Sequence, residues 1–316
     1  MKIALSGLVY VLWLSLLFSI SSCTKDSSSS ADPGTTTIKV TDAAIDDASV
    51  KGAVVTISDI KLDGQSVQGF NKTTIDLMAY QNGSTRTLGN FNLQNRTYSS
   101  ITFVLDLNTD ANGSSPGCYV LTAGNVKNAL QSDMNTVTIN KSFTLQSSVS
   151  NSLVADFDLR KMITHEARST DHYDFVTGAE LQSSVRLIVE GQSGTVSGML
   201  TDNVSASDKV IVYAYKKGTY NFATETQAQG SSGIQFKNAV SSAQVSTNGS
   251  YQLHFLESGD YEIHFASYKD TNADGEFELK GTLIVIGSGG FDLTMLSVNS
   301  SSTLSVNATA TGVLSL

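Results

Sequence analysis

The sequence is poor in charge, proline and cysteine, and each shortage excludes a class of protein. Charged residues make up 16% of the 316 residues, the formal net charge is −9, and Lys and Arg form no block. Nucleic-acid binding needs clustered cations to meet the phosphates, so this class is excluded. Two cysteines and two prolines build neither a disulfide scaffold nor a proline-rich rod. A hydrophobic content of 40% excludes a wholly disordered chain and also a protein with many membrane spans.

One long apolar run lies at the N-terminus and predicts export with a lipid anchor. A basic start is followed by an uncharged stretch from Ile3 to Ile20. The segment Ile20-Ser21-Ser22-Cys23 then places an aliphatic residue and two small residues before a cysteine. This pattern resembles a bacterial lipobox, in which the cysteine is acylated and the signal peptide is cut just before it. An uncleaved signal anchor with an incidental cysteine is the alternative.

We therefore expect a signal peptide at residues 1–22 and an acylated Cys23 as the mature N-terminus. Two or more acyl chains suffice for stable anchoring, which makes the membrane a partner of this protein. Residues 23–36 are rich in Ser and Thr and are predicted to form a flexible tether. The expected location is the cell envelope, on the periplasmic or surface face of the outer membrane.

From residue 37 on, apolar residues alternate with polar ones, as in Ile101, Phe103 and Leu105. Short alternating runs separated by turn residues predict an all-β body of two β-sandwich domains, at 37–192 and 193–316. The apolar phase slips by one residue between Ile57 and Ile60, which is typical of a β-bulge. Short helices are expected only around 124–133 and 160–170.

An internal echo links the two predicted domains. The segments Leu93–Tyr98 and Leu256–Tyr261 each place a Leu and a Tyr five residues apart around a polar turn. We expect both segments to close a core with Leu, reverse the chain and re-enter the fold with Tyr. Gly259 supplies a positive-φ position in the second segment, and Asn95 is expected to do so in the first.

Four stretches of the first domain carry a family resemblance: Val40–Asp47, Val54–Ile60, Ile75–Ala79 and Ala155–Arg160. Through them, residues 36–190 resemble the bacterial family called domain of unknown function 4382, which is common in exported lipoproteins. The sequence departs from the family at Arg96, where a Gly is usual. That family has no assigned activity, so the resemblance implies a location and domain limits rather than a chemistry.

Three stretches of the second domain carry another resemblance: Gly194–Gly198, Asn248–Tyr251 and Leu256–Tyr261. Residues 194–267 are similar to the carboxypeptidase-regulatory, transthyretin-like sandwich. Such domains are accessory modules that stabilise, space, or bind carbohydrate or protein. The resemblance therefore implies a binding or spacing role for the C-terminal domain.

Few residues suggest catalysis. His165-Glu166 and Asp171-His172 offer metal-ligating groups seven residues apart, but this spacing matches no zinc pattern, and a solvated connector explains it as well. Ser115 lies in a G-x-S-x-G match whose flanks predict a loop rather than a nucleophile elbow. Cys118 stands beside apolar strand residues and is predicted to be a buried, inert thiol.

The segment 270–278 matches the first half of a calcium loop. Position 6 is Gly275, but position 12 is Gly281, so the usual bidentate Glu is missing. A hairpin turn at Asp274-Gly275 is the alternative, and both stay open. The expected calcium ligands are Asp270, Asn272 and Asp274, the carbonyl of Phe277, and Glu278.

Two further sets of polar residues are candidate sites. Asp residues lie at the ends of predicted strands, where Asp is ordinary, although converging loops would let them hold calcium. His254 and His264 are expected to point away from the core in a polar ladder, with His254 opposite Glu262. The Asp residues concerned are Asp42, Asp46, Asp47, Asp156 and Asp158.

Together these features predict a lipid-anchored, non-catalytic binding or scaffold module. Its expected ligand is a glycan or an envelope protein, because aromatic rings stack on sugars while amides bond their hydroxyls. The alternative is a metal-dependent envelope hydrolase built on His165 and His172. No cofactor other than calcium is expected.

Overall fold

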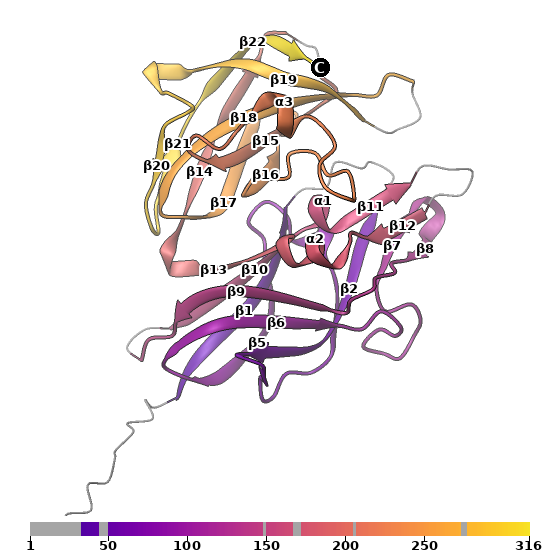
Figure 1. The fold of residues 1–316 in the computed structure, drawn as a ribbon. Helices are drawn as coiled ribbons and strands as arrows, with labels where there is room; N and C mark the ends of the chain where they lie inside the picture. Colours follow the sequence, from indigo (N-terminus) through magenta and orange to yellow (C-terminus); the bar gives the residue numbers. More distant parts are fainter. Residues whose placement is uncertain (1–32, 44–49, 148–149, 167–171, 205–206, 273–276) are drawn as a thin grey trace, which may run out of the picture. The chain divides into compact units, whose positions relative to one another are not determined.

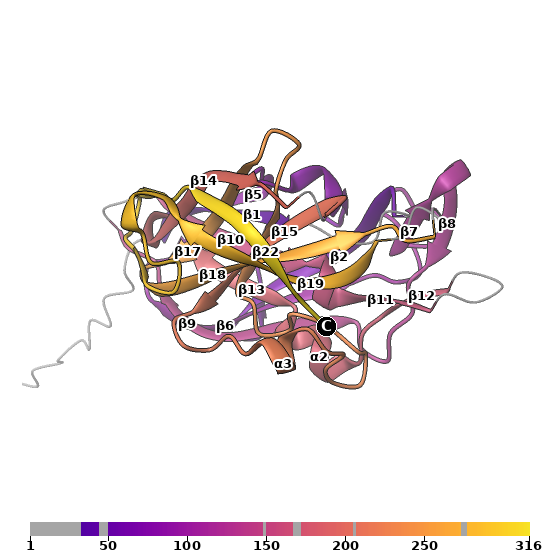
Figure 2. The same cartoon turned by 90° about the horizontal axis from the view of Figure 1, so that it is seen from above.

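The computed structural model describes residues 33–316 apart from short gaps at 44–49, 148–149, 167–171, 205–206 and 273–276. Within these residues strands are the dominant element and the helices are short, which confirms the all-β prediction (Figures 1 and 2). No helix among them is long and apolar enough to cross a membrane. The expected signal peptide and Cys23 lie outside the described residues.

The N-terminal half forms two sheets that enclose one core. The first sheet has the order β13-β10-β1-β5, and its strands are β1 (Pro33–Ala43), β5 (Arg86–Gln94), β10 (Asn151–Asp158) and β13 (Val185–Val189). The second sheet has the order β8-β7-β2-β6-β9, with β3 (Gln65–Ser66) and β4 (Thr73–Asp76) paired to β2. Its strands are β2 (Gly52–Leu62), β6 (Thr97–Leu105), β7 (Tyr119–Thr122), β8 (Val126–Ala129) and β9 (Thr136–Thr144).

A separate hairpin and a few short helices complete this half. The hairpin pairs β11 (Ile163–Glu166) with β12 (His172–Phe175). Figures 1 and 2 both place it beside β7 and β8. The helices are η1 (Leu77–Tyr80), η2 (Ala123–Asn125), α1 (Leu159–Met162), α2 (Gly178–Ser183) and η3 (Glu190–Gln192).

The C-terminal half is one nine-stranded sheet of order β16-β15-β18-β19-β22-β14-β17, with β20 paired to β18 and β21 paired to β14. Its short helices are α3 (Phe222–Glu225) and η4 (Ser288–Gly290). Its strands are β14 (Ser193–Asp202), β15 (Lys209–Lys216), β16 (Ser241–Gln244), β17 (Ser250–Glu257), β18 (Gly259–Lys269), β19 (Glu278–Gly287), β20 (Leu296–Val298), β21 (Thr303–Ser305) and β22 (Ala308–Ser315).

Strand β15 is buried on both faces, because each face packs against a different hydrophobic cluster. Val212 and Ala214 face the inner core, whereas Tyr213 and Tyr215 belong to a second cluster with Phe236. The Tyr213 and Phe236 rings stack with centroids 4.2 Å apart. The connection between β15 and β16 therefore covers this part of the outer sheet face.

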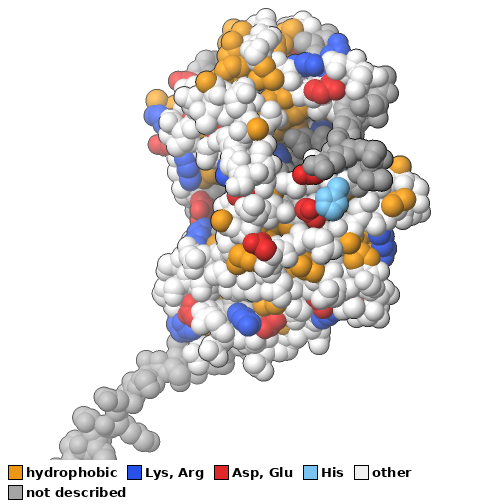
Figure 3. Space-filling model, turned by 45° about the vertical axis from the view of Figure 1, so that its right-hand side comes forward, with side chains coloured by type: hydrophobic (Ala, Val, Ile, Leu, Met, Phe, Trp, Pro, Cys, Tyr) orange, Lys and Arg blue, Asp and Glu red, His pale blue; other side chains and the backbone are white. Residues whose placement is uncertain are grey.

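The same outer face is open over β19 and β22. Ile284, Ile286 and Leu314 are 51%, 62% and 47% exposed. Hydrophobic side chains gather at the top of Figure 3, over the C-terminal half. Contiguous exposed apolar patches are characteristic of interaction sites.

The two Leu–Tyr segments adopt the same geometry, as their sequence echo predicts. Tyr98 donates a hydrogen bond from its hydroxyl to the carbonyl of Gln94 at 3.0 Å, and Tyr261 does the same to Glu257 at 2.8 Å. A basic side chain covers each ring: Arg96 lies 3.9 Å from the Tyr98 ring centroid, and Lys216 lies 4.1 Å from that of Tyr261. The positive φ expected at Asn95, in the turn of the first segment, is wrong, since Asn95 has no positive φ.

The predicted β-bulge is confirmed by a register shift between Ile57 and Asp59. The two predicted short helices are present only as single turns at 123–125 and 159–162, and residues 126–129 and 163–166 are strands instead. The end of the second predicted helix lies outside the described residues. The β-branched Ile163 and Thr164 favour the hairpin over a longer helix. Strand β1 begins at Pro33, inside the expected tether, because residues 34–36 pair with Phe91, Asn92 and Leu93 of β5.

Two arginines connect the N-terminal half to the C-terminal half. Arg186 holds the carboxylate of Asp156 at 2.6 Å and donates to the carbonyl of Phe255 at 2.7 Å. Arg160 holds Asp158 at 2.7 Å and donates to the carbonyl of Phe236 at 2.9 Å. Each arginine thus joins a strand β10 carboxylate to a carbonyl beyond residue 192.

Both acceptor residues have an uncommon backbone conformation. Phe236 has φ +50° and Phe255 has φ +55°, a region that costs a non-glycine residue of order 1–3 kcal/mol. Each of these carbonyls accepts a hydrogen bond from an arginine of the N-terminal half. The charge-assisted hydrogen bonds from Arg160 and Arg186 offset this cost.

Candidate functional site

Two adjoining cavities lie on either side of strand β11. One has a volume of about 220 Å³ and the other of about 400 Å³. They share Thr164, His165 and Ser232, so we treat them as one site, the hairpin cleft. Its walls come from the β11–β12 hairpin and from the 231–235 segment, which are more than fifty residues apart in sequence.

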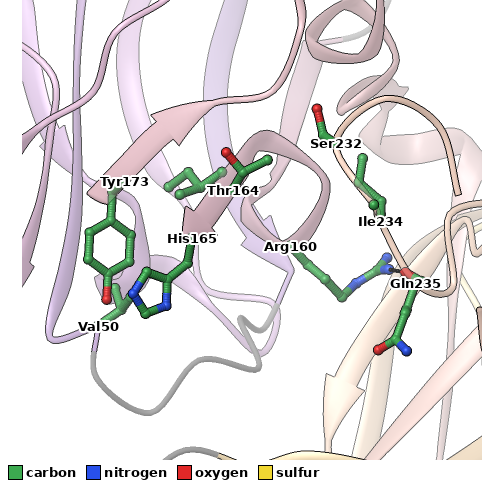
Figure 4. A pocket seen from close by; sticks show the side chains of 10 residues that line it. Val50, Arg160, Thr164, His165, Tyr173, Ser232, Ile234 and Gln235 are labelled. Carbon is green, nitrogen blue, oxygen red and sulfur yellow. Dashed lines mark hydrogen bonds between the residues drawn. The ribbon is translucent and has the colours of Figure 1, made fainter. Parts of the chain in front are cut away.

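Figure 4 shows how the smaller cavity is lined. His165 and Tyr173 lie side by side on one wall, and Ser232 and Gln235 lie on the other. The antiparallel register pairs His165 with Tyr173, and their rings stack at 4.2 Å with an angle of 6°. Both rings line the cavity, and Tyr173, at 1% exposed, is the more deeply buried of the two.

Hydrogen bonds fix the wall opposite the hairpin. Gln229 and Ile234 exchange backbone bonds of 3.0 and 2.9 Å, which closes the 229–234 loop. Ser232 donates to Glu180 of helix α2 at 2.5 Å, and Lys237 donates to the same carboxylate at 3.1 Å. Although burial alone would raise the pKa of Glu180, these bonds lower it to about 2. The wall is therefore built around an ionised, fully engaged carboxylate.

The larger cavity is acidic. Its lining includes Asp133, Glu166 and Asp174, together with hydroxyls of Ser132, Thr177 and Ser231. Asp174 holds His172 at 2.8 Å. The cleft as a whole offers an aromatic ring, hydroxyls, an amide and carboxylates. This set matches a ligand that carries many hydroxyl groups and no negative charge.

The predicted metal pair is separated by the hairpin. Because side chains alternate along a strand, His165 shares a face with Tyr173, while His172 shares the opposite face with Glu166. His165 and His172 therefore do not converge on one ion, and Asp171 lies outside the described residues. Among the residues that the structure describes, no three His, Cys, Asp or Glu side chains group as a metal site. The expected solvated connector is a strand pair.

The predicted calcium loop is described only at its two ends. The backbone N–H of Asp270 bonds Asp208 at 3.2 Å, and Thr271 donates to Glu278 at 2.7 Å. Asp274 lies outside the described residues. Glu278 therefore already closes the loop at its base, an arrangement that suits a hairpin turn and also a weak calcium site.

If the segment 270–278 is a calcium loop, the ion stabilises the full protein by about 1.4 kcal/mol at ten times its dissociation constant. Loss of the bidentate ligand at Gly281 places that constant at about 10⁻⁴–10⁻³ M. The melting temperature, followed during a Ca²⁺ titration, measures the effect. A variant with Asp270→Ala and Asp274→Ala removes it, whereas Asp133→Ala in the hairpin cleft keeps it. If the melting temperature does not rise at about 10 mM Ca²⁺, the segment is a hairpin turn and not a calcium site.

The expected ladder between His254 and Glu262 is wrong. Strand β17 pairs with β14, and β18 pairs with β15, so the Leu256–Tyr261 turn carries the chain between strands that do not pair. His264 instead stacks on Tyr220 at 3.6 Å and bonds Glu262 at 3.3 Å. Burial lowers the pKa of both His254 and His264. Neither ring is a free surface group.

The remaining candidates are structural. Cys118 is buried, and burial raises its pKa to about 11, as expected for an inert thiol. Asp42 caps helix α1 through the N–H of Leu159, and burial raises its pKa well above the usual value. Asp156 and Asp158 hold arginines. The other two members of that Asp set, Asp46 and Asp47, lie outside the described residues.

Sequence reasoning missed most of the hairpin cleft. Thr164, Tyr173, Ser232 and Gln235 were not singled out. The alternation His172, Tyr173, Asp174 carries a signal for a half-buried strand with Tyr173 inward. No local signal brings the 231–235 segment to the hairpin, because that contact depends on the junction between the halves.

Comparison with known proteins gives one family and several distant structures. No curated protein matches this chain. A structure of a Pseudomonas aeruginosa protein proposed to bind carbohydrate is 15% identical with a TM-score of 0.23, over 39% of this chain and 91% of that one. The minor pilin of Streptococcus agalactiae is 11% identical with a TM-score of 0.21, over 89% of this chain and 97% of that one. TM-scores this low do not establish a shared fold.

Residues 33–176 match the model of the family described as Domain of unknown function (DUF4382), which confirms the resemblance of the N-terminal half.

Proposed function

We propose that this protein is a non-catalytic binding module of the cell envelope, held to the outer membrane by lipid on Cys23, and that it takes a glycan in the hairpin cleft. The observation that carries the proposal is the cleft itself, where the His165 ring faces Ser232 and Gln235. An aromatic ring stacks on the apolar face of a pyranose, and hydroxyl and amide groups bond its edge.

The chemistry of the cleft favours a neutral or amino sugar. Asp133, Glu166 and Asp174 repel a carboxylate or sulfate. Arg160 lines the cleft, but its guanidinium already serves Asp158 and the carbonyl of Phe236. An acidic glycan therefore lacks a cationic partner of its own in the described lining.

A protein ligand is the second candidate, supported by the exposed aliphatic side chains of β19 and β22. The hydrolase alternative loses its main support, because His165 and His172 lie on opposite faces of the hairpin. The resemblance of residues 194–267 to carboxypeptidase-regulatory domains agrees with an accessory role.

Replacement of His165 by Ala is expected to weaken glycan binding several-fold, since loss of a stacking ring costs about 0.5–1.5 kcal/mol. A glycan array identifies the ligand, and isothermal titration calorimetry measures its dissociation constant. Phe291→Ala is the matched control, because that ring is 45% exposed and lines neither cavity of the cleft. Equal affinity in both variants, or no bound glycan on the array, contradicts the proposal.

A further inference from the structure

A second cavity of about 610 Å³ lies where the N-terminal half passes into the C-terminal half. Ligand sites commonly have volumes of about 300–1,000 Å³. We name it the junction cavity. It is lined by Thr144, Gln146, Ser150, Asn151, Ser152, Val189, Glu190, Gly191, Gln192 and Ser301.

Hydrogen bonds fix two of its walls. The side chain of Asn151, 6% exposed, accepts from the N–H of Gln146 at 3.0 Å and donates to its carbonyl at 2.9 Å. On the other wall, Ser301 donates from its backbone N–H to Ser193 at 2.7 Å and from its hydroxyl to Gly191 at 3.1 Å. The cavity is thus preformed, which lowers the entropic cost of binding.

The lining carries one formal charge, and that charge is already paired. Lys39 of β1 bonds the carboxylate of Glu190 at 2.7 Å. Burial alone would raise the pKa of Glu190, but the bonds from Lys39 and Ser152 lower it. Apart from the apolar Val189, the other side chains of the lining carry hydroxyl or amide groups.

We propose that the junction cavity binds a neutral polyhydroxylated ligand, such as an uncharged saccharide. Hydroxyls and amides both donate and accept, and a sugar hydroxyl meets both needs. An anion finds only Glu190 and a lysine that Glu190 already holds. An apolar ligand would leave the hydroxyl and amide groups unpaired. This inference rests on the junction cavity alone and holds whether or not the hairpin cleft binds a glycan.

The test uses the full protein with glucose, cellobiose and glucuronic acid as probes, measured by saturation-transfer nuclear magnetic resonance. We expect cellobiose and glucose to bind and glucuronic acid to bind more weakly. A Gln146→Ala, Gln192→Ala double variant is expected to weaken cellobiose binding by about tenfold, as for loss of two side-chain hydrogen bonds. Gln65→Ala, at an exposed position of β3, is the matched control.

Three outcomes overturn this proposal: no neutral probe binds, glucuronic acid binds as tightly as glucose, or the double variant keeps wild-type affinity. The His165→Ala variant separates the two sites. If His165→Ala abolishes cellobiose binding while the double variant keeps it, the ligand belongs to the hairpin cleft. If the double variant alone abolishes it, the junction cavity is the site.

Discussion

Replacement of Cys23 by Ala is expected to release the protein from the membrane fraction and to abolish its labelling with palmitate. The thiol is the acceptor of the diacylglycerol in a lipobox, and without it no acyl chain is attached. Two or more chains provide stable anchoring, so their loss changes the distribution between membrane and soluble fractions almost completely. Cell fractionation and radiolabelled palmitate measure the two effects.

The matched control is Cys118→Ala. The Cys118 thiol is buried, and its pKa of about 11 keeps it protonated and unreactive. This variant is expected to remain anchored and labelled like the wild type. A Cys23→Ala protein that still matures through the lipoprotein signal peptidase and carries palmitate contradicts the anchor, and so does loss of label in Cys118→Ala.

The strands were predictable where the signal is local. Alternation places Ile101, Phe103 and Leu105 in the core, and the slip between Ile57 and Ile60 marks the bulge. The Leu–Tyr turns were predictable for the same reason. In each, the Tyr hydroxyl bonds a backbone carbonyl four residues earlier, inside the same segment.

Strand partners were not predictable, because they depend on contacts far apart in sequence. Strand β1 runs parallel to β10, more than a hundred residues later, and β14 runs parallel to β21 and β22. The expected pairing of His254 with Glu262 is wrong for this reason, since β17 pairs with β14 and β18 with β15. Phe255 takes a positive φ that breaks the alternation, and Leu256 rather than Phe255 enters the core.

The hairpin cleft was hidden for a related reason. Its His165 wall was visible as a polar segment, but the expected helix at 160–170 placed it on the wrong element. The opposite wall comes from a connection that also buries Phe236 against Tyr213. The position of that wall depends on Arg160, which donates hydrogen bonds to the carbonyls of Gln235 and Phe236 at 3.1 and 2.9 Å.

The junction between the halves is therefore the part of the fold on which the sites depend most. The sequence predicts two domains divided near residue 192, and the fold places arginine contacts across that boundary. Asp156 is 4% exposed, and its charge is held by Arg186. Burial raises the pKa of Asp156, and Asp158 nearby raises it further, whereas Arg186 lowers it. Removing Arg186 leaves a buried carboxylate without this partner.

The Arg186→Met substitution is expected to lower the free energy of unfolding by about 3 kcal/mol, the lower end of the range for a broken buried ion pair, because Arg186 is a quarter exposed. The loss is largest at neutral pH. Without Arg186 the folded-state pKa of Asp156 rises further above its unfolded value, so the folded variant binds the extra proton, and stability returns as pH falls through that pKa. Urea unfolding at pH 7 and pH 5 measures both effects.

Two variants make this prediction specific. Adding Asp156→Asn to Arg186→Met is expected to restore part of the lost stability at neutral pH and to remove its pH dependence, since the buried charge is gone. Arg86→Met, on the exposed edge of β5, is expected to change stability by less than about 0.5 kcal/mol. If Arg186→Met unfolds at the same urea concentration as the wild type, the arginine does not hold the halves together. If it instead unfolds in two separate steps, the halves are domains whose cooperative unfolding depends on the Arg186 contact.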